Sequence, residues 1–327
     1  MLLVCYGTRP EYLKVKPLLE KLAGAIDFKT LFTGQHLNLV SGQTDYRLEI
    51  KDGRSRLDSI VSSIMNSFDF AQENIDMVLV QGDTTSAFAV ALSAFHHKIP
   101  VVHLEAGLRT YNLTQPYPEE ANRQMISRLA RIHLCPTLLA ARRLVTEKVP
   151  GSIEVVGNTV LDNLVNVSTS LEKKVLVTMH RRENHENMRE WFLAIDELAA
   201  NHTDHEFLLP IHPNPAVLQH RGVFEHVKVV NPMSYSELIS YLAQCSFVIT
   251  DSGGIQEEAS FLGKPCLVCR KETERSEGVG NFSLLCPAPS LLLSCYKQLE
   301  NLKLEGPCPY GDGTSSERIV NILKELV

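Results

Sequence analysis

The stretch SFVITDSGGIQEEASFLGKPCLVC, residues 246–269, decides the fold because it holds a complete strand–turn–helix–strand unit. Phe247–Thr250 is a short apolar run of the kind that forms a buried strand. Two glycines follow after two polar residues, and residues 253–262 have the pattern of a helix. Residues 264–270 return to an apolar strand. The stretch therefore predicts two parallel strands joined by a helix.

The same alternation of apolar strands and helices runs outward from this unit through the whole chain. Strands are expected at residues 1–6, 28–33, 76–83, 99–107, 132–135, 174–180, 206–212, 227–230, 247–250 and 264–270. Helices are expected from Pro10 onward and at residues 59–68, 85–95, 119–130, 188–200, 234–243, 253–262, 288–302 and 315–326. Continuously apolar strands that alternate with helices indicate parallel sheets covered on both faces.

The pattern restarts near residue 160, which predicts an α/β protein of two Rossmann-like, doubly wound parallel-sheet domains that face a cleft. We expect an N-terminal domain over residues 1–160, which carries the candidate carboxylates, and a C-terminal domain over residues 161–310. Residues 311–327 form a last helix with no strand after it. Ligands of such sheets bind beyond the carboxyl ends of the strands, so the residues just after each strand are the informative ones.

Composition excludes several classes of partner. The 327 residues are 44% hydrophobic and 21% charged, with a net charge of −6, so no basic surface for nucleic acid is expected. No apolar run is long enough to span a membrane and no secretory signal is evident, which predicts a cytoplasmic protein without membrane contact. The eight cysteines lie mostly in apolar segments. Cys266 and Cys269 lack the second pair that a zinc site needs, so no metal site is predicted.

Gly7–Glu11 follows the first strand and opens the first helix. The glycine permits a tight turn, and Arg9 and Lys14 bring cations to the start of the helix. A helix N-terminus with an arginine fork can bind an anion. A surface turn with solvated charges is an equally good interpretation of this segment alone.

Carboxylates follow several strands of the first domain. Asp83 and Glu105 each lie at the end of a strand, and Glu119 opens a helix together with Glu120. Carboxylates at helix starts often only cap the helix, which explains Asp83 and Glu120 well enough. Glu105 ends a buried strand where no helix begins. Carboxylates that converge at one place can divide acid and base roles between them.

Histidines and arginines follow two strands of the second domain. His180 and Arg181 come after the strand at residues 174–179. His212 follows the next strand and is fixed between two prolines, where it could make a polar contact or transfer a proton. For a lone histidine a structural role in the loop is the more common explanation.

Ser252, Gly253 and Gly254 place backbone N–H groups and a hydroxyl at the start of a helix, as a phosphate-binding turn does. Glu258, farther along the helix, could accept both hydroxyls of a ribose. Arg275 supplies a cation just beyond the next strand. A plain helix start with a solvated pair of glutamates is the weaker alternative. Neither the dinucleotide-binding nor the P-loop motif is present, which argues against a nicotinamide enzyme or a P-loop phosphotransferase.

Taken together, these segments closely resemble the non-hydrolysing UDP-N-acetylglucosamine 2-epimerases. The segments that carry the resemblance occur in the expected order over nearly the whole chain: GTRPEYLKVKPL, TGQH, GDTTSAFAVALSAF, HLEAGLRT, PYPEEANRQ, VGNTVLDNL, HRREN, HPNP, DSGGIQEEASFLGKP, ETERSEG and PYGDGTSSERIVNIL. The resemblance implies the glycosyltransferase-B architecture, with the C-terminal helix returning to the first domain. It also implies a homodimer in polysaccharide biosynthesis, without NAD, another cofactor or an obligatory metal.

The resemblance implies UDP-GlcNAc and UDP-ManNAc as substrate and product. UDP would be eliminated to give 2-acetamidoglucal and then added back, while a proton reaches carbon 2 on the opposite face. The positions that match catalytic residues of the family are Asp83, Glu105, Glu119 and His212. The positions that match substrate-binding residues are Arg9, Lys14, Arg123, His180, Arg181, Ser252, Gly253, Gly254, Glu258 and Arg275.

The chain departs from the family pattern in three places. The connection between TGQH and Asp76 is shorter than usual, and His185 stands where glycine is common, so the activating second substrate site of many bacterial members is not expected in its usual form. The Ala-Gly-Thr segment that contacts uracil is replaced by Gly278-Val-Gly. Ser276 replaces a proline, with little consequence expected.

Three other functions remain open at this point. A hydrolysing epimerase would begin with the same elimination but release ManNAc and UDP, and a related enzyme could epimerise a modified UDP-sugar. A glycosyltransferase would use the same architecture but need an acceptor. A sugar-nucleotide sensor would have no need of the set Asp83, Glu105 and Glu119.

Overall fold

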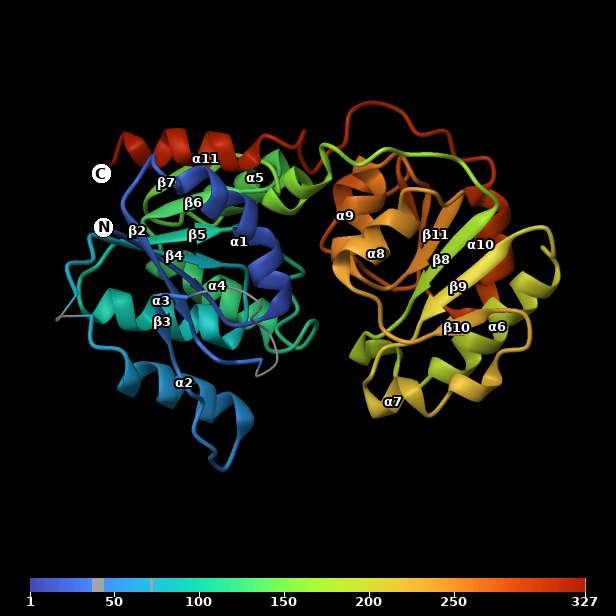
Figure 1. Ribbon diagram of the computed structural model, residues 1–327, viewed down its shortest axis with the longest axis horizontal. Coiled ribbons are helices and arrows are strands. Elements are labelled where there is room, and N and C mark those ends of the chain that lie inside the picture. The colour runs from blue at the N-terminus through green and yellow to red at the C-terminus, as the bar shows by residue number, and fades with distance from the viewer. Residues whose placement is uncertain (37–43, 71–72, 327) are drawn as a thin grey trace. The chain divides into compact units, whose positions relative to one another are not determined.

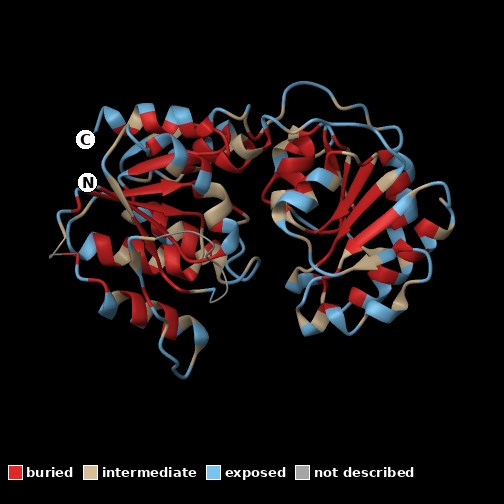
Figure 2. Cartoon of the chain, in the orientation of Figure 1, coloured by how far each residue is buried: buried red, intermediate tan, exposed pale blue. Residues whose placement is uncertain are grey.

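The computed structural model describes residues 1–36, 44–70 and 73–326. The chain divides into two compact units, one of residues 1–163 with 310–327 and one of residues 164–309 (Figure 1). Each unit is built on one parallel sheet with helices on its faces, which confirms the predicted α/β class. Figure 2 shows that the strands form the buried layer of each unit.

The sheet of the first unit has the order β3-β2-β1-β4-β5-β6-β7, with every pair parallel. Its strands are β1 (Leu2–Tyr6), β2 (Phe28–Phe32), β3 (Tyr46–Arg47), β4 (Met77–Gln81), β5 (Val101–Leu104), β6 (Ile132–Cys135) and β7 (Ser152–Val155). Chain order reverses between β1 and β4. This is the switch point at which doubly wound sheets bind ligands.

The strands of this sheet are buried on both faces. In β1, Leu2, Val4 and Tyr6 enter one core cluster, while Leu3 and Cys5 enter the other. This alternation is the two-residue period of a strand, and burial on both sides explains why the strands are continuously apolar.

Helices cover both faces of the first sheet. They are α1 (Arg9–Leu22), α2 (Arg56–Ser67), α3 (Thr85–His96), α4 (Glu119–Leu129), α5 (Leu138–Thr146) and α11 (Ser315–Lys324), with a 3-10 turn η1 (Thr159–Leu164) at the end of the unit. The C-terminal α11 packs along α1, with Ile319, Val320 and Leu323 in the same core as Val15 and Leu18 (Figure 1).

The sheet of the second unit has the order β10-β9-β8-β11-β12-β13, again all parallel. Its strands are β8 (Lys174–Thr178), β9 (Glu206–Pro210), β10 (Lys228–Val230), β11 (Phe247–Thr250), β12 (Cys266–Val268) and β13 (Ser283–Leu285). Its α-helices are α6 (Met188–Ala200), α7 (Pro215–Leu218), α8 (Tyr235–Leu242), α9 (Gly253–Phe261) and α10 (Leu292–Leu299). Short 3-10 turns are η2 (Arg182–Asn184), η3 (Arg221–Val223), η4 (Ser276–Gly278) and η5 (Pro289–Leu291). Its switch point lies between β8 and β11.

Local capping explains where several helices begin. Thr8 and Glu11 form a reciprocal capping box at the start of α1, and Ser234 and Glu237 form another at α8. Thr84 and Thr137 accept hydrogen bonds from the first turns of α3 and α5. A side-chain oxygen before the first turn satisfies an N–H that has no partner within the helix.

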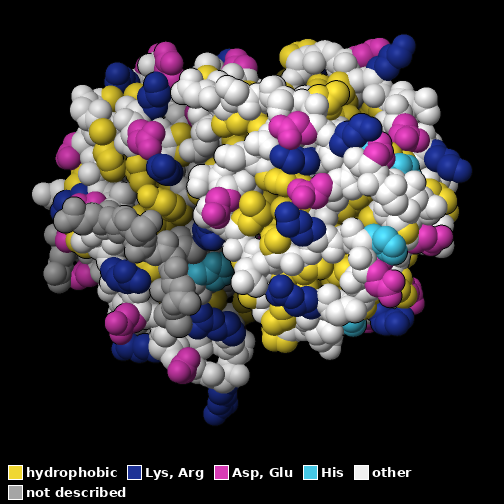
Figure 3. Space-filling view, turned by 45° about the vertical axis from the view of Figure 1, so that its right-hand side comes forward, with side chains coloured by type: hydrophobic (Ala, Val, Ile, Leu, Met, Phe, Trp, Pro, Cys, Tyr) yellow, Lys and Arg dark blue, Asp and Glu magenta, His cyan; other side chains and the backbone are white. Residues whose placement is uncertain are grey.

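Among the described residues, no helix is long and apolar enough to cross a membrane. On the surface that Figure 3 shows, basic and acidic side chains are interspersed.

Candidate active site

Most of the candidate residues lie just beyond the carboxyl ends of the strands in each unit. In the first unit, Gly7 follows β1 and Asp83 follows β4, on the two sides of its switch point, and Glu105 follows the adjacent β5. In the second unit, His180 follows β8 and Ser252 follows β11 in the same way. Both groups therefore occupy the part of a doubly wound sheet that binds ligands.

Glu105 is held in an uncommon backbone conformation. Its φ is +65°, a region that residues other than glycine enter at a cost in free energy. The residue is 8% exposed, and its carboxylate accepts hydrogen bonds from Lys14 Nζ at 2.5 Å, Gln81 Nε2 at 2.5 Å and Asn158 Nδ2 at 3.2 Å. Strained residues that the surroundings fix so closely are concentrated at functional sites. Glu105 is thus the best-supported carboxylate of the predicted set.

Asp83 forms an ion pair with the buried Arg123. Arg123 Nη2 lies 2.9 Å from Asp83 Oδ2, while its Nε lies 3.6 Å from Glu120 and 3.4 Å from the carbonyl oxygen of Glu119. Arg123 Nη1 is buried and has no hydrogen-bond partner within the part of the chain that the structure describes. Asp83 is thus more than a cap, because the ion pair joins it to the α4 helix that Glu119 begins.

Glu120 has a structural role, but it does not cap the helix as predicted. No side chain caps α4, and the fully buried Glu120 carboxylate instead accepts from the backbone N–H groups of Thr110 and Tyr111 at 2.9 and 3.1 Å. Glu120 therefore fixes the loop that leads to Glu119, which is half-buried at the first position of the helix.

The start of α1 is not an open backbone site for an anion. The N–H groups of Gly7 and Thr8 both donate to the buried carboxylate of Glu11, at 2.8 and 2.6 Å. Burial, although offset by these hydrogen bonds, raises the pKa of Glu11. Any anion at this turn would have to be bound by side chains such as the exposed Arg9, which remains a candidate.

Asp251, which the sequence analysis did not single out, organises the second unit. It is fully buried, and its carboxylate accepts from the backbone N–H of His180 at 3.0 Å, that of Arg181 at 2.9 Å and Asn184 Nδ2 at 3.0 Å. One carboxylate at the end of β11 thereby fixes the loop after β8. The position of Asp251 between a buried strand and the Ser-Gly-Gly turn could have identified it from the sequence.

His180 and His212 stack on one another, with ring centroids 5.1 Å apart and an interplanar angle of 23°. Burial, together with nearby cations, lowers the pKa of His180 although Asp251 opposes the change, and burial also lowers the pKa of His212. The backbone N–H of Asn214 donates to His212 Nδ1 at 3.1 Å, so the proton of the neutral ring is on Nε2. His212 is thus a neutral donor on an exposed loop.

The first turn of α9 is packed against Arg275. The structure confirms that α9 begins at Gly253, and a Cβ at this glycine would lie 2.8 Å from Arg275 Cζ. The guanidinium is held by Glu257 Oε1, 2.8 Å from its Nε, and by Glu274. A side chain at this position would displace the guanidinium from its place. The turn at Ser252 and this cation together favour an anionic ligand.

Glu257 and Glu258 are buried, so the alternative of a solvated glutamate pair is wrong. Glu257 binds Arg275, whereas Glu258 Oε1 accepts from the hydroxyl of Tyr235 at 2.9 Å. Burial, aided by Glu258, raises the pKa of Tyr235 well above its ordinary value, so the phenol stays a donor. Tyr235 was also missed, because its partner lies on a different helix.

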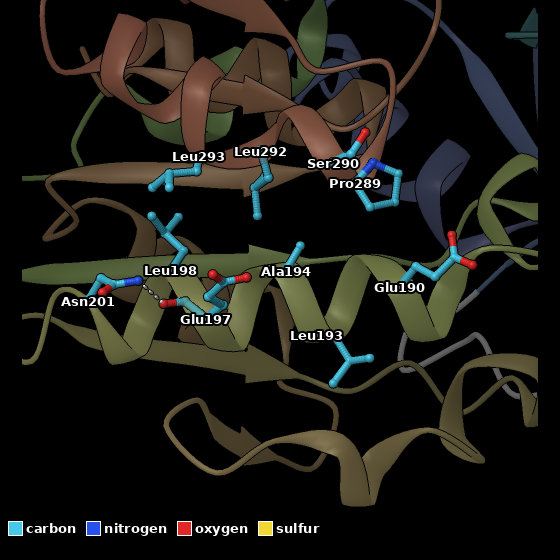
Figure 4. A pocket seen from close by; sticks show the side chains of 10 residues that line it. All are labelled: Glu190, Leu193, Ala194, Glu197, Leu198, Asn201, Pro289, Ser290, Leu292 and Leu293. Atoms are coloured by element: carbon cyan, nitrogen blue, oxygen red, sulfur yellow. Dashed lines mark hydrogen bonds between the residues drawn. The ribbon is translucent and has the colours of Figure 1, made fainter.

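A separate pocket of about 410 Å³ lies between α6 and the η5–α10 segment (Figure 4). Leu292 and Leu293 extend toward α6 and Leu198 extends toward them, while Glu190 and Glu197 lie along the α6 side. None of its lining residues belongs to the candidate site, and we assign it no part in the chemistry. Among the described residues, no group of three or more His, Cys, Asp or Glu side chains is arranged to hold a metal ion.

Comparison with known proteins shows which family the chain resembles. A family model described as UDP-N-acetylglucosamine 2-epimerase matches residues 21–324. A UDP-N-acetylglucosamine 2-epimerase of Campylobacter jejuni is 38% identical, over 98% of this chain and 97% of that protein. The protein of the same name from Bacillus subtilis is also 38% identical, over 97% and 93%.

A solved structure gives the same result for the fold. The UDP-GlcNAc 2-epimerase of Neisseria meningitidis, bound to UDP-GlcNAc, has a TM-score of 0.87 and is 34% identical, with 99% of each chain covered. The glycosyltransferase-B-like class with two Rossmann-like domains is therefore confirmed. On the family model, the relatives and the fold together, the chain belongs to the UDP-N-acetylglucosamine 2-epimerase family of enzymes.

Proposed function

We propose that this enzyme interconverts UDP-GlcNAc and UDP-ManNAc without net hydrolysis. The observation that carries the proposal is Glu105, a buried carboxylate with φ of +65° that is held by Lys14 and Gln81. A strained, closely fixed carboxylate at a strand end is what proton transfer at a sugar carbon needs.

The reaction that suits these groups is an elimination followed by an addition. A base removes the proton of carbon 2, the bond between carbon 1 and the phosphate oxygen breaks, and its electrons leave with UDP. Carbons 1 and 2 are then joined by the double bond of 2-acetamidoglucal. Return of UDP to carbon 1, with a proton delivered to the other face of carbon 2, gives the epimer.

The residues of the first unit fit the proton transfers. Glu105, Asp83 and Glu119 are the candidate acids and bases, and the cations Lys14 and Arg123 contact two of them. Lys14 favours the ionised form of its partner and stabilises negative charge that develops nearby. Two faces of one carbon require groups in two positions, which a set of carboxylates on separate elements supplies.

The residues of the second unit fit the nucleotide. We infer that Ser252 and the first turn of α9 bind the diphosphate with Arg275, and that Glu258 binds the ribose. His212, neutral and protonated on Nε2, would donate a hydrogen bond to the departing phosphate oxygen. His180 and Arg181, on the neighbouring loop, would be further hydrogen-bond donors to the phosphates.

Proton NMR of the purified protein with UDP-GlcNAc in deuterated water tests the proposal. We expect UDP-ManNAc with deuterium at carbon 2, and UDP only as a minor species. Accumulation of free ManNAc and UDP would instead establish a hydrolysing epimerase. No conversion of UDP-GlcNAc would overturn the proposal and favour a modified UDP-sugar or, if an acceptor were consumed, a glycosyltransferase.

We also propose that the enzyme acts as a homodimer. Light scattering coupled to size-exclusion chromatography measures its mass directly. A mass of one chain of 36.6 kDa would contradict the dimer.

A further inference from the structure

The segment Val156–Leu164, between β7 and the second unit, has no place in the proposed chemistry so far. We propose that Asn158 is a positioning residue that fixes the orientation of the Glu105 carboxylate, and that the C-terminal segment Tyr310–Ser316 holds Asn158 in place. This inference rests on the proposed catalytic role of Glu105.

The side chain of Asn158 is oriented by its own segment. Its Oδ1 accepts from the backbone N–H of Val160 at 3.2 Å, so its Nδ2 is the group that faces Glu105. That Nδ2 donates to Glu105 Oε1 at 3.2 Å, and Asn158 is 3% exposed. The amide therefore presents its N–H donor to Glu105. It cannot turn to present its oxygen without losing the hydrogen bond from the backbone N–H of Val160.

Asn158 acts on a different oxygen from the other donors. Lys14 Nζ and Gln81 Nε2 both bind Glu105 Oε2. Charged or titratable groups near Glu105 include the ammonium of Lys14 from α1 and the buried imidazole of His103 from β5. With Oε2 held from one side and Oε1 from the other, the plane of the carboxylate is fixed as well as its place.

The same segment also fixes the helix that carries Lys14. Thr159 Oγ1 donates to the carbonyl oxygen of Lys14 at 2.5 Å, and Asn163 Nδ2 donates to that of Leu13 at 3.0 Å. Consecutive residues of one segment thus contact both members of the Lys14–Glu105 ion pair.

The C-terminal segment in turn fixes this segment. The backbone N–H of Asn158 donates to the carbonyl oxygen of Tyr310 at 2.7 Å, and Asp162 accepts from the N–H groups of Ser315 and Ser316 at 3.1 and 2.7 Å. Gly157 has φ of +89°, and a Cβ there would lie 2.5 Å from Ser315 Oγ. The approach is too close for a side chain, which explains a glycine before Asn158.

Two substitutions at Asn158 separate positioning from a structural role. Asn158→Ala removes the side-chain hydrogen bonds to Glu105 and Val160. Asn158→Asp keeps an acceptor for Val160 but replaces the donor with a negative charge about 3 Å from Glu105. A structural role predicts that Asp is the milder change, whereas a positioning role predicts that Asp is the more severe one because like charges repel.

The experiment measures UDP-GlcNAc conversion for both variants and for Asn66→Ala, a control on α2 that loses an amide hydrogen bond to Ser62 but none to Glu105. We expect Asn158→Ala to lower kcat about 10- to 100-fold with KM within about twofold, Asn158→Asp to lower it further, and the control to stay within about threefold of the unsubstituted enzyme. A kcat for Asn158→Asp equal to or above that of Asn158→Ala would overturn the inference.

A second measurement reads the contact without relying on activity. The carboxyl carbon of Glu105 is followed by NMR in protein labelled with ¹³C at glutamate, and Glu105→Gln assigns its signal. Loss of a donor that favours the ionised form should move the titration of this signal to higher pH in Asn158→Ala but not in Asn66→Ala. An unchanged titration overturns the inference, whereas failure of the unsubstituted enzyme to convert UDP-GlcNAc counts against the proposed function.

Discussion

The carboxylates next to the candidate site have different surroundings in the two units. In the first unit, Glu105 is paired with the partly accessible cation Lys14, and Asp83 pairs with Arg123 while keeping part of its own surface exposed. In the second unit, Asp251 and Glu257 are almost fully buried and are bound to backbone N–H groups and to Arg275.

This difference shows that residue type alone does not identify a reactive group. Under the proposed function, Glu105 and Asp83 exchange protons, whereas Asp251 and Glu257 hold hydrogen-bond donors in place. What the second unit presents is the neutral imidazole of His212 and the first turn of α9, both suited to an anion. The proposed function therefore assigns acid–base chemistry to residues of one sheet and anion binding to residues of the other.

Among the substitutions considered, Glu105→Gln is expected to have the largest effect, and the effect is on kcat. The amide keeps the shape of the side chain but cannot accept a proton from carbon 2, so kcat should fall about 1,000-fold or more. UDP binding, measured by calorimetry, should change little because the residues proposed to bind the nucleotide lie in the second unit. Glu20→Gln, at an exposed ion pair on α1, is the matched control and should behave as the unsubstituted enzyme does. Unchanged conversion by Glu105→Gln would refute its catalytic role.

Asp251→Asn should weaken UDP binding and lower the stability of the second unit, with an effect smaller than that of Glu105→Gln. The amide turns a donor toward backbone N–H groups and removes charge-assisted hydrogen bonds, which costs on the order of 3 kcal/mol. We expect weaker UDP binding and a lower unfolding midpoint in denaturant. A variant with unaltered UDP affinity would show that the loop at His180 does not need this carboxylate.

His103 should make the first unit sensitive to acid. It is fully buried beside the carbonyl oxygen of Gly82, and burial lowers its pKa to about 3. The unfolded chain binds a proton near pH 6.5 and the folded chain does not, so stability falls as the pH drops from about 6.5 toward 3. The loss is about 1.4 kcal/mol for each pH unit in that window.

Urea unfolding at several pH values, compared with His103→Gln, isolates this contribution. Glu11, whose pKa is raised by burial, changes the stability with pH in the opposite direction. The informative quantity is therefore the difference in unfolding free energy between the unsubstituted protein and His103→Gln. The stability difference between them should change with pH below about 6.5. A difference independent of pH would show that His103 does not titrate on unfolding.

The fold was predictable from sequence because strands buried on both faces are continuously apolar. The elements that were missed lack that signal: β3 has two residues, β7 is a partly exposed edge strand with a glutamate, and β13 is three residues long. Helix α5 was overlooked although Thr137 caps it. The predicted helix at residues 59–68 begins earlier, at Arg56, because Ser55 supplies the cap.

The candidate site was predictable only in part. Residues that follow strands could be identified by position, and the resemblance supplied roles for them. Partners such as Asn158, Gln81 and Tyr235 could not, because each contact joins elements distant in sequence and depends on the register in which they pack. The buried state of Glu257 and Glu258 was not predicted for the same reason, since Arg275 and Tyr235 lie on other elements.

Gly253→Ala gives the smallest expected effect and the sharpest test of the anion site in the second unit. Its Cβ would lie 2.8 Å from Arg275 Cζ, so the guanidinium must shift while Glu257 and Glu274 still hold it. Gly254 is the matched comparison, because a Cβ there would meet nothing nearer than Ser252 Oγ at 3.9 Å. Both changes add one methyl group to the same helical turn, yet only one displaces the cation. We expect Gly253→Ala to weaken UDP binding about tenfold, or about 1.4 kcal/mol, and Gly254→Ala to weaken it less. Equal losses would mean that α9 binds the anion through its backbone alone and that Arg275 serves only to hold Glu257 and Glu274.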